Sequence, residues 1–193
     1  MEIAIRFGQV SGNFYCSYNK LSSLEGCPKS VGGYFDCNNN NLSQLLLCPV
    51  SVGGGFSCGS NQLTSLVGCQ ERIIGSFLCG NNKLTDLVGG PIEVGRSFVC
   101  YDNKLSSLEG CPKSVGGDFY CDGNQLLSLE GGPISVGGNF HSGNNHISDS
   151  ELFLYDYNNN DMIRQYYKNK NLNEDLRVIF IEETDTQIKK KKI

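Results

Sequence analysis

The chain has 193 residues, a formal net charge of −4 and 39% hydrophobic residues. This length is enough for one domain with a buried core, and the acidic balance argues against the basic surface of a nucleic-acid-binding protein. No apolar run approaches the length of a membrane span, and the N-terminal segment Met1–Phe7 is a poor signal peptide. We therefore expect no nucleic-acid partner, no membrane contact and a cytoplasmic location in the producing or host cell.

Residues 1–9 alternate weakly between apolar and polar side chains. They come directly before a long repeat, and the terminal units of a repeat protein need a cover over their outer apolar face. We predict an N-terminal capping strand over residues 1–9.

A 21-residue unit repeats seven times in register through residues 10–146. The copies, referred to as coils one to seven, begin at Val10, Val31, Val52, Ile73, Val94, Val115 and Val136. A fixed period of this length is typical of a solenoid, in which every unit buries its apolar face against its neighbours. The seventh copy is degraded, and the pattern ends after Ile147.

Each copy contains a phenylalanine and, two residues later, a cysteine that becomes serine in coil seven. The phenylalanines are Phe14, Phe35, Phe56, Phe77, Phe98, Phe119 and Phe140, and the second column is Cys16, Cys37, Cys58, Cys79, Cys100, Cys121 and Ser142. Apolar residues that alternate with variable ones predict a short strand with one buried face. Successive copies would pair in parallel, about 4.8 Å apart.

An asparagine follows three residues after this cysteine position in every copy: Asn19, Asn40, Asn61, Asn82, Asn103, Asn124 and Asn145. A side-chain amide carries two donors and an acceptor, so it can satisfy backbone groups where the chain turns out of a strand. We predict that these residues form a structural asparagine ladder. Leucine columns that begin at Leu21 and Leu24 complete the predicted core.

The last third of each unit contains glycine and proline, at Pro28, Pro49, Pro91, Pro112 and Pro133. Proline in this segment prevents a helix from continuing. We expect an extended, irregular return side and a mostly β solenoid.

These columns resemble the leucine-rich repeat, whose signature is L-x-x-L-x-L-x-x-N-x-L. Phenylalanine takes the second leucine position, cysteine the third, and asparagine and leucine follow at the expected offsets. The proline-bearing end of the unit, as in residues 24–28, is similar to that of bacterial effector-type short repeats. The resemblance implies a right-handed superhelix with a parallel sheet on its concave face. The near-identical coils and the Asn-, Lys-, Tyr- and Ile-rich C-terminus also resemble leucine-rich-repeat proteins of phages and other viruses.

The repeat is followed by residues 147–183, for which we predict a small α+β cap. Asn160 begins a short predicted helix that ends near Tyr167, and residues 176–181 form a predicted strand. Residues 184–193 are polar and lysine-rich, and we interpret them as a disordered tail.

Ten cysteines fall in two columns, the strand column and a second one at Cys27, Cys48, Cys69 and Cys111. Glycine replaces single members of the second column, which an obligate disulfide scheme would not tolerate easily. We interpret the cysteines as free and buried, because buried free cysteine behaves as a small hydrophobic residue and a reducing cytosol preserves it. Structural disulfides, and a metal- or redox-responsive use of the columns, remain the alternatives.

A candidate partner-binding patch lies on the strand-flanking positions of coils four to six. Its apolar centre is Leu78, Val99, Tyr101 and Tyr120, and its rim is Asp102, Asp118 and Asp122. Exposed aromatics with an apolar centre and a charged rim are typical of protein-binding hot spots. Alternatively, such aromatics stack along the sheet and stabilise it, which is the favoured interpretation for Tyr15, Tyr18 and Tyr34 beside Asp36.

The leading functional hypothesis is a non-enzymatic protein-protein recognition module that binds through its concave sheet, in a phage, viral or bacterial factor directed at a host protein. It requires no cofactor or metal. His141 and His146 lack a neighbouring nucleophile pattern, so no catalytic residues are predicted. A structural or self-assembling repeat protein is the second hypothesis, and a cysteine-based metal- or redox-responsive protein is the third.

Overall fold

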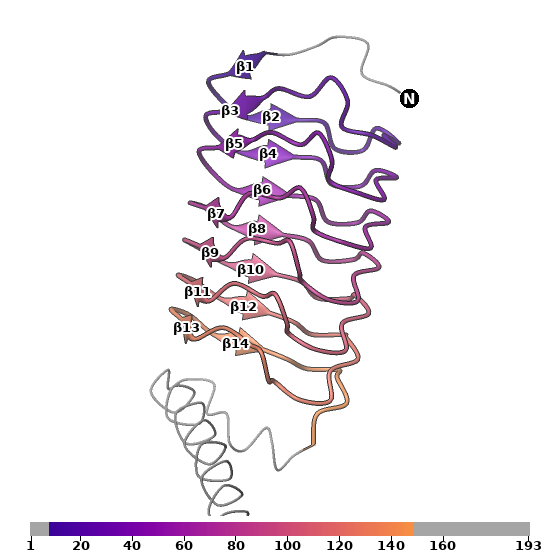
Figure 1. The fold of residues 1–193 in the computed structure, drawn as a ribbon, viewed down its shortest axis with the longest axis vertical. Coiled ribbons are helices and arrows are strands. Elements are labelled where there is room, and N and C mark those ends of the chain that lie inside the picture. Colours follow the sequence, from indigo (N-terminus) through magenta and orange to yellow (C-terminus); the bar gives the residue numbers. More distant parts are fainter. Residues whose placement is uncertain (1–7, 149–193) are drawn as a thin grey trace, which may run out of the picture.

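The computed structural model describes residues 8–148 as a parallel-β solenoid built from short strands, with no helix in this range (Figure 1). The predicted mostly β, parallel repeat architecture is confirmed. The predicted α+β cap, apart from its first two residues, and the lysine-rich tail lie outside the described residues, as do residues 1–7 of the predicted capping strand.

The main sheet contains one strand from each coil and has the order β14-β12-β10-β8-β6-β4-β2. Its strands are β2 (Phe14–Tyr15), β4 (Phe35–Asp36), β6 (Phe56–Ser57), β8 (Phe77–Leu78), β10 (Phe98–Val99), β12 (Phe119–Tyr120) and β14 (Phe140–His141). All pairs are parallel, and the register places each phenylalanine beside that of the next coil. The hydrogen-bond ladder extends past the strands, as in the bond from Cys37 N to Ser57 O (2.9 Å).

The core lies directly behind the main sheet and is made of identical residues stacked coil on coil. Neighbouring phenylalanine rings stack along its length, with ring centroids 5.9 Å apart for Phe14 and Phe35 and 4.9 Å apart for Phe119 and Phe140. The strand cysteines and both leucine columns are buried against them. Because every coil supplies the same side chains, each coil is packed by its neighbours and none has a core of its own.

A second set of two-residue strands runs along the return side, just before each main-sheet strand in the chain. One three-stranded sheet contains β1 (Gln9–Val10), β3 (Ser30–Val31) and β5 (Ser51–Val52), and one four-stranded sheet contains β7 (Arg72–Ile73), β9 (Glu93–Val94), β11 (Ser114–Val115) and β13 (Ser135–Val136). The valine or isoleucine of each strand from β3 onwards is buried. The return side, which was expected to be extended and irregular, therefore also contains parallel strands, and the buried residue of each from β3 onwards is its valine or isoleucine.

The second set of strands is interrupted between β5 and β7, where coil four departs from the consensus. Glycine follows the valine in coils two, three, five, six and seven, and a Cβ at Gly53 would lie 2.3 Å from the carbonyl oxygen of Gly32. Coil four has Ile74 at this position, so its backbone cannot approach coil three as closely. The Gln70 side chain instead bridges the gap, accepting from Val52 N (3.1 Å) and donating to Pro49 O (2.8 Å).

Candidate functional site on the main sheet

The asparagine column forms a continuous ladder between neighbouring coils. The Asn61 amide donates to the carbonyl oxygens of Cys37 and Cys58 (both 3.1 Å), and its Oδ1 accepts from Leu42 N (3.0 Å). Corresponding bonds are made by Asn40, Asn82, Asn103, Asn124 and Asn145. Asn19 in coil one differs, since it is exposed and its amide donates to Ser17 O (2.8 Å). The ladder has a structural role, and it fixes the backbone that carries the outer side chains.

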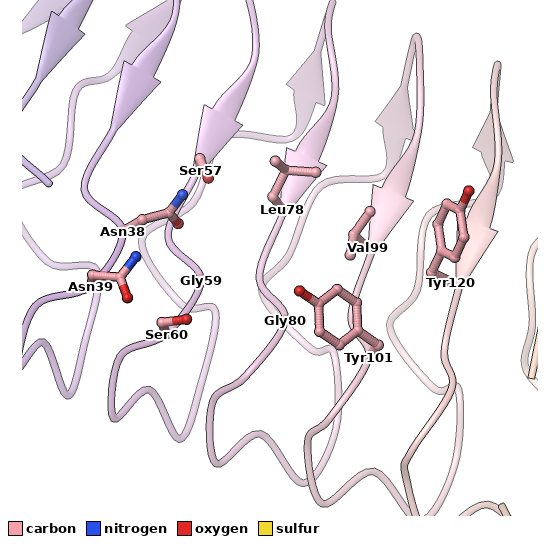
Figure 2. Close-up of a pocket in the computed structure, with 10 residues that line it drawn as sticks. All are labelled: Asn38, Asn39, Ser57, Gly59, Ser60, Leu78, Gly80, Val99, Tyr101 and Tyr120. Atoms are coloured by element: carbon pink, nitrogen blue, oxygen red, sulfur yellow. The ribbon is translucent and has the colours of Figure 1, made fainter. Parts of the chain in front are cut away.

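A groove of about 470 Å³ lies on the outer face of the main sheet, across coils two to six. It is lined by Asn38, Asn39, Ser57, Gly59, Ser60, Leu78, Gly80, Val99, Tyr101 and Tyr120 (Figure 2). The four apolar residues of the predicted patch thus lie together, with a polar half from coils two and three that the sequence alone did not single out. We call this feature the outer groove. The predicted rim residues Asp102, Asp118 and Asp122 do not line it.

Tyrosine rings on this face lean over glycines of neighbouring coils. A Cβ at Gly80 would lie 3.0 Å from the Cε1 atom of Tyr101, and a Cβ at Gly55 would lie 2.6 Å from the Cε2 atom of Tyr34. Tyr101 nevertheless keeps 37% of its surface exposed. Its ring therefore packs along the sheet and still offers a free face to the outer groove, so the stacking and binding interpretations both apply to it.

Tyr120 at the far end of the outer groove is held from two sides. Its ring stacks on His141 with centroids 4.4 Å apart and an interplanar angle of 1°, and its hydroxyl donates to Asp118 Oδ2 (3.2 Å). Both contacts fix the ring orientation. A fixed aromatic ring loses little conformational entropy when a partner binds.

Two polar atoms at the other end of the outer groove are buried without a hydrogen-bond partner, Ser57 Oγ and Asn38 Oδ1. Ser57 is fully buried. Burial also raises the pKa of the Tyr34 phenol on the same face. An unpaired buried polar group costs about 1–3 kcal/mol. The sequence signal for Ser57 was weak, because its burial depends on a tyrosine of the preceding coil.

Four positions of each coil are called strand-flanking here: the residue before the main-sheet phenylalanine, the residue between it and the cysteine position, and the two residues after that position. Across the seven coils these positions carry negative but no positive side chains. The carboxylates are Asp36, Asp102, Asp118 and Asp122, and none of these positions holds lysine or arginine. Three carboxylates also accept backbone N–H groups: Asp36 from Asn38 (2.9 Å), Asp118 from Asn139 (2.8 Å) and Asp122 from Gly143 (2.9 Å). These bonds anchor the acidic side chains, and the outer face keeps its negative potential.

All ten thiols are free in the structure. Burial raises the pKa of Cys69 and of Cys111 to about 12 and that of Cys48 to about 11. A hydrogen bond between Cys16 and Cys27 raises the pKa of the first thiol and lowers that of the second. The thiols whose pKa is raised by burial stay protonated at neutral pH. Within residues 8–148, no three His, Cys, Asp or Glu side chains are grouped to hold a metal ion.

No known protein family, curated protein or solved structure matches the chain. No helix in the described part could cross a membrane. The fold and the outer groove are therefore the basis for any functional conclusion.

Proposed function

We propose that this chain is a non-enzymatic recognition module of the leucine-rich-repeat type, and that it binds a protein segment bearing basic and aliphatic side chains in the outer groove. One observation carries the proposal: the outer groove joins partly exposed Leu78, Val99 and Tyr101 to the partly exposed polar side chains of Asn39 and Ser60. A protein segment has both the polar groups and the apolar side chains that such a surface can contact.

The apolar half of the outer groove supplies the non-directional part of the binding energy. Leu78 and Val99 are partly exposed on adjacent strands, with the Tyr120 ring on the next strand beyond Val99 and the Tyr101 ring beside Gly80 (Figure 2). Covering an exposed aliphatic side chain contributes about 25 cal/mol per Å² of apolar surface removed from water. Aromatic residues that frame such a centre are typical of interface hot spots.

The polar half supplies direction. The Asn39 amide and the Ser60 hydroxyl, which are partly exposed in the outer groove, can each donate and accept hydrogen bonds. A partner that places polar groups opposite them is favoured, because a polar group left desolvated and unpaired costs about 1–3 kcal/mol.

Charge selects among protein partners. The outer face holds four carboxylates and no cationic side chain at the strand-flanking positions, so it attracts lysine and arginine and repels a phosphate backbone. Affinity should therefore fall as the salt concentration rises.

The leucine-rich-repeat assignment rests on the Phe, Cys, Asn and Leu offsets of the unit and on the asparagine ladder. With it we propose that the solenoid is a right-handed superhelix and that the main sheet lines its concave face. We also propose a cytoplasmic phage, viral or bacterial factor that acts on a host protein, supported by the near-identical coils and the composition of the C-terminus.

The test is a selection from a random peptide display library on the immobilised chain, followed by affinity titration of the enriched peptides. The matched variant is Leu78→Ser/Tyr101→Gly, because coil three already has Ser57 and Gly59 at these positions. Its affinity should fall at least about tenfold, a loss of about 1.4 kcal/mol. The control Lys104→Gln introduces the residue that coils three and six have at this position, Gln62 and Gln125, and it should bind as the wild type does. Peptides without basic residues, or equal binding by the double variant, would refute the proposal.

A further inference from the structure

A second apolar surface lies on the return side of the solenoid, away from the outer groove. Two hollows of about 540 and 490 Å³ occupy equivalent repeat positions, the first in coils one and two and the second in coils three to five. The second cysteine column forms their floor, with a glycine in coil four: Cys27, Cys48, Cys69, Gly90 and Cys111. We call this surface the return-side trough.

The two walls of the return-side trough are repeat columns. The first wall is Glu25, Leu46, Val67, Val88 and Glu109 in coils one to five, and the second is Lys29, Val50, Glu71, Ile92 and Lys113. Its aliphatic side chains are strongly exposed, from 45% for Ile92 to 79% for Val50. Leu47 adds another exposed aliphatic side chain beside the first wall. Contiguous exposed aliphatics framed by charges indicate an interaction surface.

The two walls have the same order of charged and aliphatic side chains except in coil three, and the charges at the ends of one wall are opposite to those at the ends of the other. The first wall is acidic in coils one and five, and the second is basic in the same two coils. Aliphatic residues occupy both walls in coils two and four. The trough is therefore complementary to itself, and we propose that it binds a second copy of this chain, related by a two-fold axis parallel to the trough.

Two troughs can face each other about a two-fold axis that runs either parallel to the trough or across it. The charges of the walls favour the parallel axis. A two-fold axis parallel to the trough places the first wall of one copy against the second wall of its partner, coil against the same coil. Glu109 then faces Lys113 of the other copy, while Leu46 faces Val50 and Val88 faces Ile92. An axis across the trough would instead place Glu25 against Glu109 and Lys29 against Lys113, where like charges repel.

The fit is imperfect in coil three, where Val67 faces Glu71. Five coils at about 4.8 Å spacing give a contact roughly 19 Å long. This is a short strip, so the contact is a reversible dimer whose extent depends on protein concentration.

The test is sedimentation velocity of the full chain under reducing conditions over a wide concentration range. We expect a monomer-dimer equilibrium. In Leu46→Glu/Val88→Glu, each new side chain is one that coils one and five carry at the same position, so the coil tolerates it, and each new carboxylate faces an aliphatic side chain of the other copy, Val50 or Ile92. The dimer dissociation constant should rise at least about a hundredfold. Tyr101→Gly in the outer groove is the matched control and should dimerise normally.

Charge variants test the orientation separately. Lys113→Glu should weaken the dimer roughly fivefold, because it places two carboxylates together at two symmetric positions. Glu109→Lys/Lys113→Glu should restore wild-type association. A chain that stays monomeric at the highest concentration, an unaffected Leu46→Glu/Val88→Glu variant, or a Glu109→Lys/Lys113→Glu variant as weak as Lys113→Glu would overturn the proposal. None of these results depends on whether the outer groove binds a peptide.

Discussion

The asparagine ladder makes a quantitative prediction about a single buried amide, that of Asn82. Replacing it with alanine removes donors to the carbonyl oxygens of Cys58 (3.1 Å) and Cys79 (3.0 Å) and an acceptor for Leu63 N (3.0 Å). Each of the two carbonyls keeps an asparagine donor from its own or the next coil. Leu63 N has no other partner, so one buried N–H group is left unpaired.

The expected loss of stability follows from this one unpaired N–H group. One unpaired buried N–H group costs about 1–3 kcal/mol, and the space left by the amide adds about 1 kcal/mol. We expect Asn82→Ala to lower the free energy of unfolding by about 2–4 kcal/mol. Asn19→Ala is the matched control in coil one, where the amide is exposed and donates only to Ser17 O, and it should cost no more than about 0.5 kcal/mol.

The measurement is urea unfolding followed by far-ultraviolet circular dichroism with reductant present, since the chain contains no tryptophan. Equal midpoints for Asn82→Ala and Asn19→Ala would refute the reasoning, because the ladder would then contribute nothing beyond an exposed amide. Asn82→Asp adds a second comparison. It keeps an acceptor for Leu63 N but turns a charged oxygen toward two carbonyls, so it should destabilise more at neutral pH than at acid pH.

Three further predictions concern the thiols, the turn and the break in the second set of strands. Burial raises the pKa of Cys69 and Cys111 from 9.0 to about 12, so above pH 9 the unfolded chain loses protons that the folded chain keeps. Stability should therefore fall between pH 9 and 12, by up to about 1.4 kcal/mol per pH unit for each such thiol; a urea midpoint unchanged from pH 8 to 10 would contradict this. Leu47 has a positive φ of 66° and is 66% exposed, and coil four has Gly89 at the same position with a φ of 81°. Leu47→Gly should therefore raise the free energy of unfolding by up to about 1 kcal/mol, and with it the thermal midpoint. A lowered midpoint would mean that contacts of the Leu47 side chain stabilise the fold. Ile74→Gly should let β5 and β7 pair, and hydrogen exchange should then slow at the amide of position 74; unchanged exchange would show that Ile74 does not cause the break.

Much of the fold could be predicted because seven copies repeat the same information. The position of Phe56 alone says little, but seven phenylalanines at one position identify the buried face of a strand. The second set of strands was harder to predict, since each contains only two residues and the apolar signal is a single valine. The following glycine is informative only once the spacing of the coils is known, because its role is to leave room for a carbonyl oxygen of the neighbouring coil.

The candidate site was predicted in part. Leu78, Val99, Tyr101 and Tyr120 could be grouped because the repeat gives their registration directly. Ser57 could not, since a serine on a sheet face is ordinarily solvated. Its burial arises beside a glycine two residues earlier in coil three, over which a tyrosine of coil two lies. That arrangement depends on differences between coils, and a repeat consensus averages such differences away.

The interrupted pairing between β5 and β7 gives the solenoid a seam on one side only. Across it the main sheet is continuous, with Phe56 paired to Phe77, while the return side is joined by the Gln70 side chain and by a hydrogen bond from Gly75 N to Gly54 O (3.0 Å). The outer groove straddles this seam, with Ser57 on one side and Leu78 on the other. Fewer backbone hydrogen bonds join the coils on the return side at the seam, so we expect amide hydrogen exchange there to be faster than at the other coil junctions of residues 8–148.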